Sequence, residues 1–289
     1  MNTIYRPPSE ANSLILQATY GCSYNECAFC AMYRGVRFRV RPMEELRTEI
    51  AAARAAIGPD LRKVFLADGD ALIAKPAFLH GVIAELHAAF PSLQRIACYA
   101  SPQSLAVRTE TQMRELREAG LTQYYLGIES GHDTVLAKLT KGVDSAEMVR
   151  VALKAHDAGV RLSVMILLGA GGRALSREHA LASAAVVNAI QPRFVSTLVM
   201  TPVEGTPLGE WDARGAVDHL EPLELARELR DFLGALQLHS SVFRSNHASN
   251  YLALGGSLPK DQPMLLAALD SILVNPRRAP FRPDWARGL

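Results

Sequence analysis

Six apolar runs of strand length alternate with helix-like stretches, and this alternation limits the possible folds more than any other feature of the sequence. The apolar runs cover residues 13–20, 63–67, 95–100, 123–128, 161–168 and 193–200. The helix-like stretches cover residues 43–56, 76–90, 109–119, 132–140, 145–158 and 176–190. Strand–helix units of similar length predict a parallel sheet with right-handed crossover connections.

Eight such units would close a full barrel, so six units predict an α/β fold with a partial (β/α)6 parallel barrel that is open on one side. A doubly wound open sheet is the alternative that the pattern leaves. We expect residues 1–208 to form the barrel core, after an irregular lead-in at residues 1–12. Residues 209–289, with helices near 222–238 and 260–273, are expected to form a helical C-terminal extension that covers the open side.

The composition is that of an ordinary globular protein. Of the 289 residues, 49% are apolar and 21% are charged, and the net charge is +2. This balance gives no sign of a large nucleic-acid-binding surface, and no apolar run is long enough to span a membrane. The first eight residues lack the apolar core of a signal peptide. We therefore expect a reducing compartment, the cytoplasm.

Three of the four cysteines, Cys22, Cys27 and Cys30, fall within nine residues directly after the first apolar run. Thiolates this close together on a loop indicate a metal site. Three thiolates suit a four-iron iron–sulfur cluster, in which each thiolate holds one iron and the fourth iron stays open to another ligand. A structural zinc site is the alternative. Zinc needs four ligands, however, and the loop has no histidine, while Cys98 lies within an apolar run.

The cysteine loop resembles the cluster loop of the radical S-adenosylmethionine (SAM) superfamily, whose usual pattern is Cys-x3-Cys-x2-Cys with an aromatic residue before the third cysteine. Phe29 holds the aromatic position and the second gap matches, whereas the first gap has four residues. One extra residue in an exposed loop costs little free energy. The resemblance implies a [4Fe–4S] cluster and SAM as cofactors, with Phe29 beside them and SAM on the open iron.

The strands after the first and second helices end in further features of this family. The resemblance implies that the turn Asp68-Gly69-Asp70 binds the amino group of the methionine part of SAM. Glycine allows a close approach of the backbone, and Asp70 offers a carboxylate to an ammonium group. Asp68 stands where the family usually has another glycine. Ser101 is the preferred candidate for a contact to the ribose, ahead of Tyr99.

The next two strand ends supply three more candidates. Gly127-Ile-Glu129-Ser-Gly131, followed by Lys141, resembles the subgroup of the oxygen-independent coproporphyrinogen dehydrogenases and the methylthiotransferases. The resemblance implies that Glu129 contacts SAM, that Lys141 binds its carboxylate and that Leu168 holds the adenine. Ordinary structural roles remain open, with Glu129 at a helix N-terminus and Lys141 near a helix C-terminus.

Arg37, Arg39 and Arg41 alternate with apolar residues, which predicts an extended segment with the three side chains on one side. One interpretation is a solvated edge. Another is positive charge that compensates the thiolates and a bound anionic group. A third is a small RNA-binding stripe.

Residues 243–251 are the best candidates for the substrate side, because they lie outside the SAM-binding part and are rich in polar groups. The candidate residues are Asn246, His247, Ser249 and Asn250. A surface turn is the alternative. The tail at 275–289 is rich in proline and arginine, and we expect a loosely held strap there.

The sequence therefore predicts a radical SAM enzyme that cleaves SAM reductively to give a 5′-deoxyadenosyl radical, which removes hydrogen from a small-molecule substrate. An electron donor such as flavodoxin or ferredoxin is expected. Nucleic acid is disfavoured because no separate RNA-binding domain follows the barrel. The alternatives are an RNA- or peptide-modifying radical SAM enzyme and a non-catalytic protein of the same barrel that handles a cluster, zinc or haem.

Overall fold

The structure is a computed structural model that describes residues 4–288, so residues 1–3 of the expected lead-in and Leu289 of the expected extension lie outside the described part. Its main sheet is mostly parallel and has eight strands. They are β1 Leu14–Gln17, β4 Lys63–Ala67, β5 Arg95–Ala100, β6 Leu121–Glu129, β7 Arg161–Leu168, β8 Phe194–Val199, β9 Ser241–Ser245 and β10 Leu254–Leu258. Two short strands, β2 Thr19–Tyr20 and β3 Arg39–Val40, pair separately. The predicted α/β fold with a parallel sheet is confirmed.

Helices connect the parallel strands, as predicted. The α-helices are α1 Met43–Ile57, α2 Pro76–Ala89, α3 Pro102–Val107, α4 Glu110–Ala119, α5 Asp133–Lys138, α6 Ser145–Asp157, α7 Gly172–Ile190, α8 Pro207–Ala213, α9 Pro222–Ala235 and α10 Gln262–Val274. The 3-10 helices are η1 Pro8–Glu10, η2 Ala71–Ile73, η3 Pro276–Arg278 and η4 Asp284–Ala286. Within residues 4–288, no helix combines the length and the apolar character that a membrane crossing requires.

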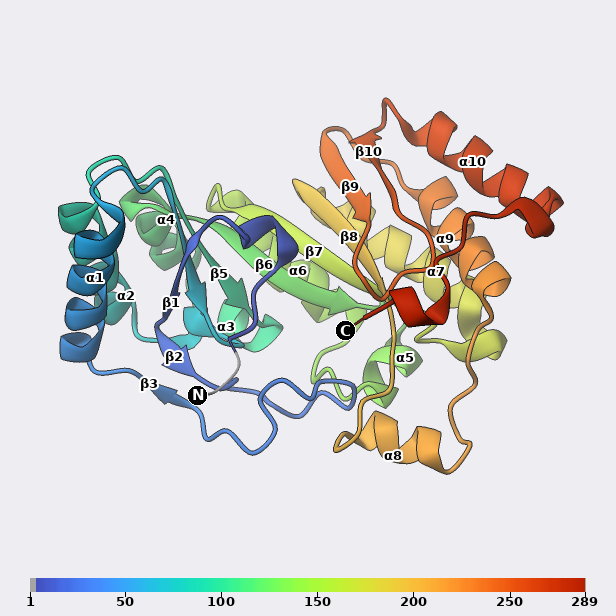
Figure 1. The fold of residues 1–289 in the computed structure, drawn as a ribbon, viewed down its shortest axis with the longest axis horizontal. Helices are drawn as coiled ribbons and strands as arrows, with labels where there is room; N and C mark the ends of the chain where they lie inside the picture. The colour runs from blue at the N-terminus through green and yellow to red at the C-terminus, as the bar shows by residue number, and fades with distance from the viewer. Residues whose placement is uncertain (1–3, 289) are drawn as a thin grey trace. The chain divides into compact units, whose positions relative to one another are not determined.

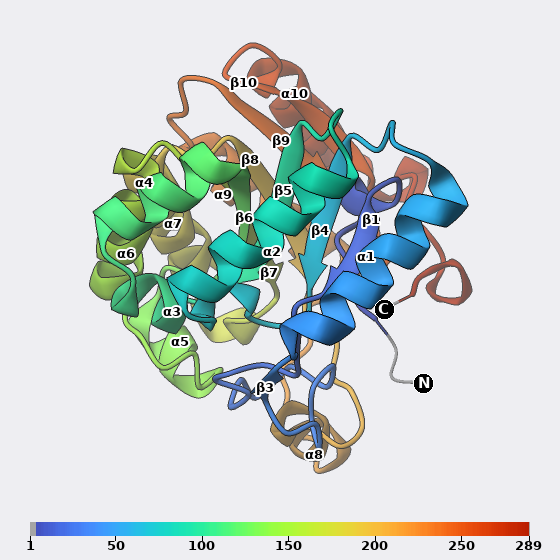
Figure 2. The ribbon, with the colours of Figure 1, turned by 90° about the vertical axis from the view of Figure 1, so that its left-hand side faces the viewer.

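The chain divides into two compact units, and each is described by itself. The first comprises residues 4–25, 32–126 and 151–162. In it β1, β4, β5 and β6 pair in parallel, and α1, α2 and α4 lie side by side (Figure 2). Apolar side chains such as Phe65 and Leu86 are fully buried, and their removal from water stabilises this arrangement. Parallel strands end at one edge of a sheet, so the loops after β1 and β4 are neighbours there.

The second unit comprises residues 26–31, 127–150 and 163–288. Here β7, β8 and β9 pair in parallel and β10 runs antiparallel to β9. Helix α9 lies between α7 and α10 (Figure 1). The part after residue 208 therefore contributes two strands as well as helices, which the sequence did not predict. Their sequences, Ser241-Val-Phe-Arg-Ser245 and Leu254-Gly-Gly-Ser-Leu258, are short and poor in β-branched residues, so they lack a strand signal of their own.

Candidate active site

Cys22 lies beside Gly69 in the first unit, so the cysteine loop meets the turn after β4. A Cβ atom on Gly69 would lie 2.6 Å from the Cβ of Cys22 and 2.7 Å from the ring of Tyr33. The Gly69 N–H donates to the carbonyl of Gly21 at 3.1 Å. No side chain fits at position 69, because the space is already filled. The structure thus brings together Cys22 and the Asp68–Asp70 turn, two features that the sequence predicted separately.

The carboxylate of Asp70 is buried and already has protein partners. It accepts hydrogen bonds from the Oγ atoms of Ser23 at 2.5 Å and Ser101 at 2.7 Å. Burial raises the pKa of Asp70, and hydrogen bonds from Ser23, Ser104 and Ser101 oppose that rise. Asp70 therefore ties the residue after Cys22 to Ser101. A contact of Asp70 with SAM stays a prediction, and Ser23 is a residue that sequence reasoning missed.

Asp68 holds the same loop by another route. Its backbone φ is 74°, in the left-handed region, where the family's glycine would be unstrained. Its carboxylate accepts from the backbone N–H of Gly21 at 2.7 Å and from Nε2 of Gln17 at 3.0 Å. These bonds explain why an aspartate fits this position: the carboxylate caps the backbone just before Cys22.

Cys27 and Cys30 belong to the second unit and lie in one short turn. The Cys30 N–H donates to the carbonyl of Cys27 at 3.2 Å, and the Ala28 N–H donates to the carbonyl of Leu139 at 2.9 Å. The ring of Phe29 packs against a cluster whose buried members are Val135, Leu139, Leu167 and Ala170. The turn is thus fixed to the segment that follows β6 and to the end of β7.

The state of the thiols fits an iron–sulfur cluster. None of the four cysteines, all within the described residues, forms a disulfide; Cys98 is buried, whereas Cys22, Cys27 and Cys30 are partly exposed. Burial raises the pKa of the Cys98 thiol well above its usual value, which disfavours it as a ligand. Between residues 4 and 288, no three His, Cys, Asp or Glu side chains converge as a single metal ion would require. Cys22, Cys27 and Cys30 are thus the candidate cluster ligands, and their ligation stays a prediction.

Glu129 and Lys141 form a buried ion pair in the second unit. The Lys141 Nζ donates to Oε1 of Glu129 at 3.0 Å, and both side chains are about nine-tenths buried. A Cβ atom on Gly127 would lie 1.9 Å from the same oxygen, so the pair needs glycine there. Glu129 itself has a φ of 66°. Strain of this kind at a non-glycine residue is typical of functional sites. The structure brings the two predicted residues together, and their contact with SAM stays a prediction.

The turn after Glu129 is held by helix α7 through residues that the sequence did not single out. Ser130 Oγ donates to Nδ1 of His179 at 2.8 Å, and Nε2 of His179 donates to the carbonyl of Leu167 at 3.0 Å. The Gly131 N–H donates to Oγ of Ser183 at 2.9 Å. Burial lowers the pKa of His179 to about 4, so the ring is neutral. A histidine inside a helix carries no sequence signal for this bridging role.

Leu168, the predicted adenine contact, lies at the end of β7. It lines a cavity in the second unit together with Val199 of β8 and with Leu225 and Leu229 of α9. The neighbouring residue, Leu167, is the one that joins the Phe29 cluster. Successive residues of a strand face opposite sides of a sheet, so a step of one residue exchanges these environments. Leu168 thus shares a cavity with residues of α9, and its contact with adenine stays a prediction.

The four substrate-side candidates differ in accessibility. Asn250 is buried, and its Oδ1 accepts from the backbone N–H of Val199 at 2.8 Å while its amide donates to another carbonyl of β8. Ser249 is also buried, and its hydroxyl pairs with Nδ1 of His247 at 2.9 Å. Asn246 is exposed and His247 is half-buried. Asn250 and Ser249 thus hold the end of β8, and Asn246 and His247 are the more accessible candidates.

The predicted arginine stripe is only partly free for a ligand. Arg41 bonds Glu45, Glu49 and the carbonyl of Gln17. The guanidinium of Arg39 lies 4.4 Å from the ring centroid of Tyr20, a cation–π contact. These contacts anchor the loop that follows the cysteines within the first unit.

Three comparisons place the chain among known proteins. The sequence profile of the Radical SAM superfamily matches residues 16–177, more than half of the chain. The chain belongs to the radical SAM superfamily of enzymes. Its curated relatives include the biotin synthases of Zymomonas mobilis subsp. mobilis, 29% identical over 61% of this chain and 46% of that protein, and of Synechococcus elongatus, 27% identical over 78% and 68%.

The solved structures agree on the fold of this radical SAM chain. Coproporphyrinogen III oxidase (HemN) from Escherichia coli, described as a radical SAM enzyme, superposes with a TM-score of 0.59 at 14% identity, over 77% of this chain and 52% of that chain. Likeness at this identity shows the fold alone, so the narrower subgroup predicted from Glu129 and Lys141 stays a prediction. The chain spans about half the length of the first biotin synthase above.

Proposed function

We propose that this chain is a radical SAM enzyme in which Cys22, Cys27 and Cys30 hold a [4Fe–4S] cluster, and that it acts on a small-molecule substrate. The observation that carries the proposal is the superfamily match at residues 16–177, which contains all three partly exposed thiols. When bound, the cluster supplies the electron that cleaves SAM into methionine and a 5′-deoxyadenosyl radical, which removes a hydrogen atom from the substrate.

The protein's own residues bind and orient the reactants in this proposal. Lys141 carries three N–H donors, so it can keep its bond to Glu129 and still donate to the carboxylate of SAM. Asp68 and Asp70 fix the loop of Cys22 through the bonds described above, and Ser101 is held next to Asp70 for the ribose. Burial of Asp68, Asp70 and Lys141 keeps water away from a reactive radical.

The proposal also covers the class of substrate and the partners. The relatives named biotin synthase make a small-molecule product by name, which supports a small molecule over a macromolecule here. Asn246 and His247 are proposed to contact it, as the accessible members of the predicted segment. We also propose an electron donor such as flavodoxin or ferredoxin and a reducing compartment, the cytoplasm, since cysteines that form no disulfide suit both. A core at 1–208 with an extension at 209–289 remains our proposed division.

Anaerobic reconstitution with iron and sulfide tests the proposal. The wild-type chain should take up about four irons and, after reduction, convert SAM into 5′-deoxyadenosine. Simultaneous replacement of Cys22, Cys27 and Cys30 by alanine should abolish both. Cys98→Ala is the matched control, because it removes a buried thiol of the same chain and should retain both. Full iron loading of the triple variant, or stoichiometric zinc without iron in the wild type, would contradict the proposal.

A further inference from the structure

A glutamate outside the superfamily match reaches the end of a strand inside it. Glu228 lies on α9, beyond residues 16–177, and is 1% exposed. Its Oε1 accepts from the backbone N–H of Gly169 at 2.7 Å, and its Oε2 accepts from Oγ of Ser176 at 2.5 Å. Gly169 directly follows β7 and Ser176 lies in the first turns of α7, so one carboxyl group spans the whole β7–α7 turn.

The N–H of Gly169 is bonded by a side chain, the buried carboxyl of Glu228. The turn's own carbonyls have other donors: that of Leu168 accepts from the N–H of Met200, and that of Gly169 accepts from the N–H of Gly172. Gly169 has a φ of 81°, which bends the chain away from the strand ladder. A buried backbone N–H without an acceptor is costly, so the carboxyl of Glu228 decides whether the bend is stable.

The same helix also packs against the bend. A Cβ atom on Gly169 would lie 3.3 Å from Leu225, one turn before Glu228. Leu225 and Leu229 line the cavity that contains Leu168. Helix α9 therefore supports the turn with apolar contacts on both sides of the buried carboxyl.

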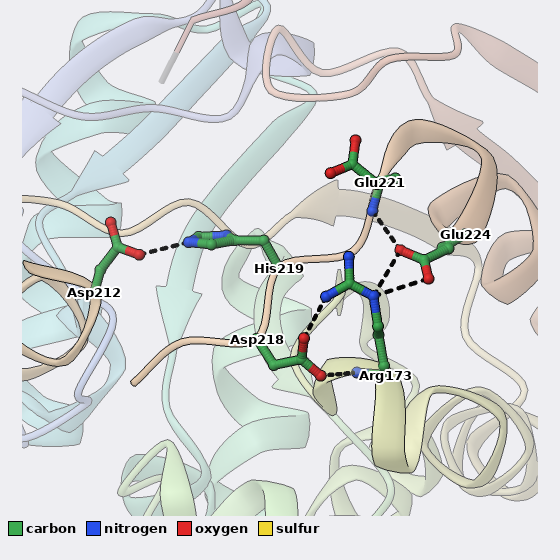
Figure 3. A network of polar contacts seen from close by, with 6 residues as sticks. All are labelled: Arg173, Asp212, Asp218, His219, Glu221 and Glu224. Carbon is green, nitrogen blue, oxygen red and sulfur yellow. Dashed lines mark hydrogen bonds and ion pairs between the residues drawn. The ribbon is translucent and has the colours of Figure 1, made fainter. Parts of the chain in front are cut away.

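By contrast, Glu224 on the same helix contacts α7 in a partly exposed network with Arg173 and Asp218 (Figure 3). Exposed ion pairs contribute little to stability.

We propose that Glu228 is a positioning residue that fixes the Leu168–Gly169 turn of the SAM site from the part of the chain beyond the superfamily match. The inference rests on the proposed function, in which the end of β7 holds the nucleoside of SAM. Glu228 does not touch SAM; it sets the backbone that does. Its neutral analogue glutamine can keep both bonds, because the amide oxygen accepts from Gly169 and the amide N–H donates to Ser176.

Two measurements on the full chain test this role. The first is amide hydrogen exchange at Gly169, which needs neither cluster nor SAM. Glu228→Ala should speed exchange at Gly169 at least tenfold, Glu228→Gln less than threefold, and the control Arg227→Ala, at the exposed position before Glu228 on α9, should leave it unchanged. The second is the dissociation constant of SAM for the anaerobically reconstituted protein. Glu228→Ala should weaken SAM binding at least tenfold with full iron content, whereas the glutamine and control variants should bind within threefold of wild type.

Unchanged exchange at Gly169 in Glu228→Ala, or unchanged SAM affinity in that variant, would overturn the proposal. If Glu228→Ala does not fold, Ser176→Ala takes its place, because it removes one of the two hydrogen-bond partners of the carboxyl. Exchange at Gly169 should then rise about threefold. No rise in that variant would also overturn the proposal. A wild-type chain that carries its cluster but does not bind SAM would refute the proposed function and the role toward SAM. The exchange measurement would still decide whether Glu228 holds the turn.

Discussion

At the scale of single residues, the candidate site depends on two glycines whose positions have no room for a side chain. Gly127 leaves room for the Glu129 carboxylate, and Gly69 leaves room for Cys22. The motifs predicted Glu129, Lys141 and Cys22 as site residues, and the structure gives each a buried or close partner. Sequence reasoning could not find the bonds that hold them, because those depend on side-chain directions that a motif does not encode.

The ion pair of Glu129 and Lys141 gives a prediction at this scale. Lys141→Ala should weaken SAM binding while iron content stays full, because the substitution removes a buried, charge-assisted donor. Loss of such a contact costs about 1.5–3 kcal/mol, or roughly ten- to a hundredfold in affinity. Equilibrium dialysis of the reconstituted protein with labelled SAM measures the effect.

Lys138→Ala is the matched control for Lys141, since Lys138 lies on α5, three residues earlier, and is exposed. The two variants lose the same charge, and the control should bind SAM like the wild type. Equal affinities in both variants would show that Lys141 serves only its ion pair with Glu129.

Leu167 and Leu168 show how strongly the surroundings of a residue depend on its register in the strand. In β7 the seven residues after Arg161 are all apolar or small, so they give no alternation of polar and apolar positions and the sequence does not say which face each residue takes. The structure assigns Leu167 to the cluster with Phe29 and Leu168 to the cavity under α9.

At the scale of elements, the six predicted strands and their helices were found because each is a long apolar or amphipathic run. The strands β9 and β10 were missed because they pair with neighbours that supply most of their stability.

The N-terminal segment before β1, predicted to be irregular, contains the short helix η1 and is held by side-chain contacts. Glu10 of η1 is buried and accepts hydrogen bonds from Arg95 at 2.6 Å and Tyr125 at 2.5 Å, contacts that no local pattern indicates.

The C-terminal tail is more firmly attached than the predicted loose strap. The Arg287 guanidinium lies 3.7 Å from the ring centroid of Tyr251 and donates to the carbonyl of Ser249 at 2.9 Å. Tyr251 donates to Asp284 at 2.8 Å, and Arg282 donates to the carbonyl of His247 at 2.9 Å. The tail therefore clamps the segment that carries the accessible substrate-side candidates.

We predict that Arg287→Ala loosens residues 247–251 without unfolding the chain. Loss of one cation–π contact and one hydrogen bond to a carbonyl weakens the local structure by about 1–3 kcal/mol. Hydrogen–deuterium exchange of peptides from this segment should accelerate roughly ten- to a hundredfold. Arg277→Ala provides the comparison, because Arg277 is exposed in η3 of the same tail. Identical exchange in the two variants would mean that the tail does not hold the segment.

At the scale of the whole molecule, two buried groups of the second unit oppose each other in the pH dependence of folding. Burial lowers the pKa of His179 from 6.5 to about 4, so its contribution to stability is present above pH 6.5 and is lost as the pH falls toward 4. Burial raises the pKa of Glu228 from 4.5 to about 7, so its contribution is complete below pH 4.5 and is lost as the pH rises toward 7. His132 adds to the first shift and Asp231 to the second.

Between pH 4.5 and 6.5 the two contributions have opposite slopes and nearly cancel, so single variants should reveal each of them. Each shift corresponds to about 3 kcal/mol. The unfolding free energy of Glu228→Gln, relative to wild type, should rise by about this amount from pH 4.5 to 7, and that of His179→Gln should fall similarly from pH 4 to 6.5. Urea unfolding of the full chain at stepped pH measures both differences. The contributions of the other titrating groups cancel, because they are the same in the variant and the wild type.

Nε2 of His179 and Oε1 of Glu228 approach to 3.7 Å, so the effect of the double variant should differ from the sum of the two single effects. The plot of unfolding free energy against pH for Glu228→Gln could instead run parallel to that of the wild type. Glu228 would then ionise as readily in the folded protein as in the unfolded chain. The raised pKa assigned to this buried carboxyl would be wrong.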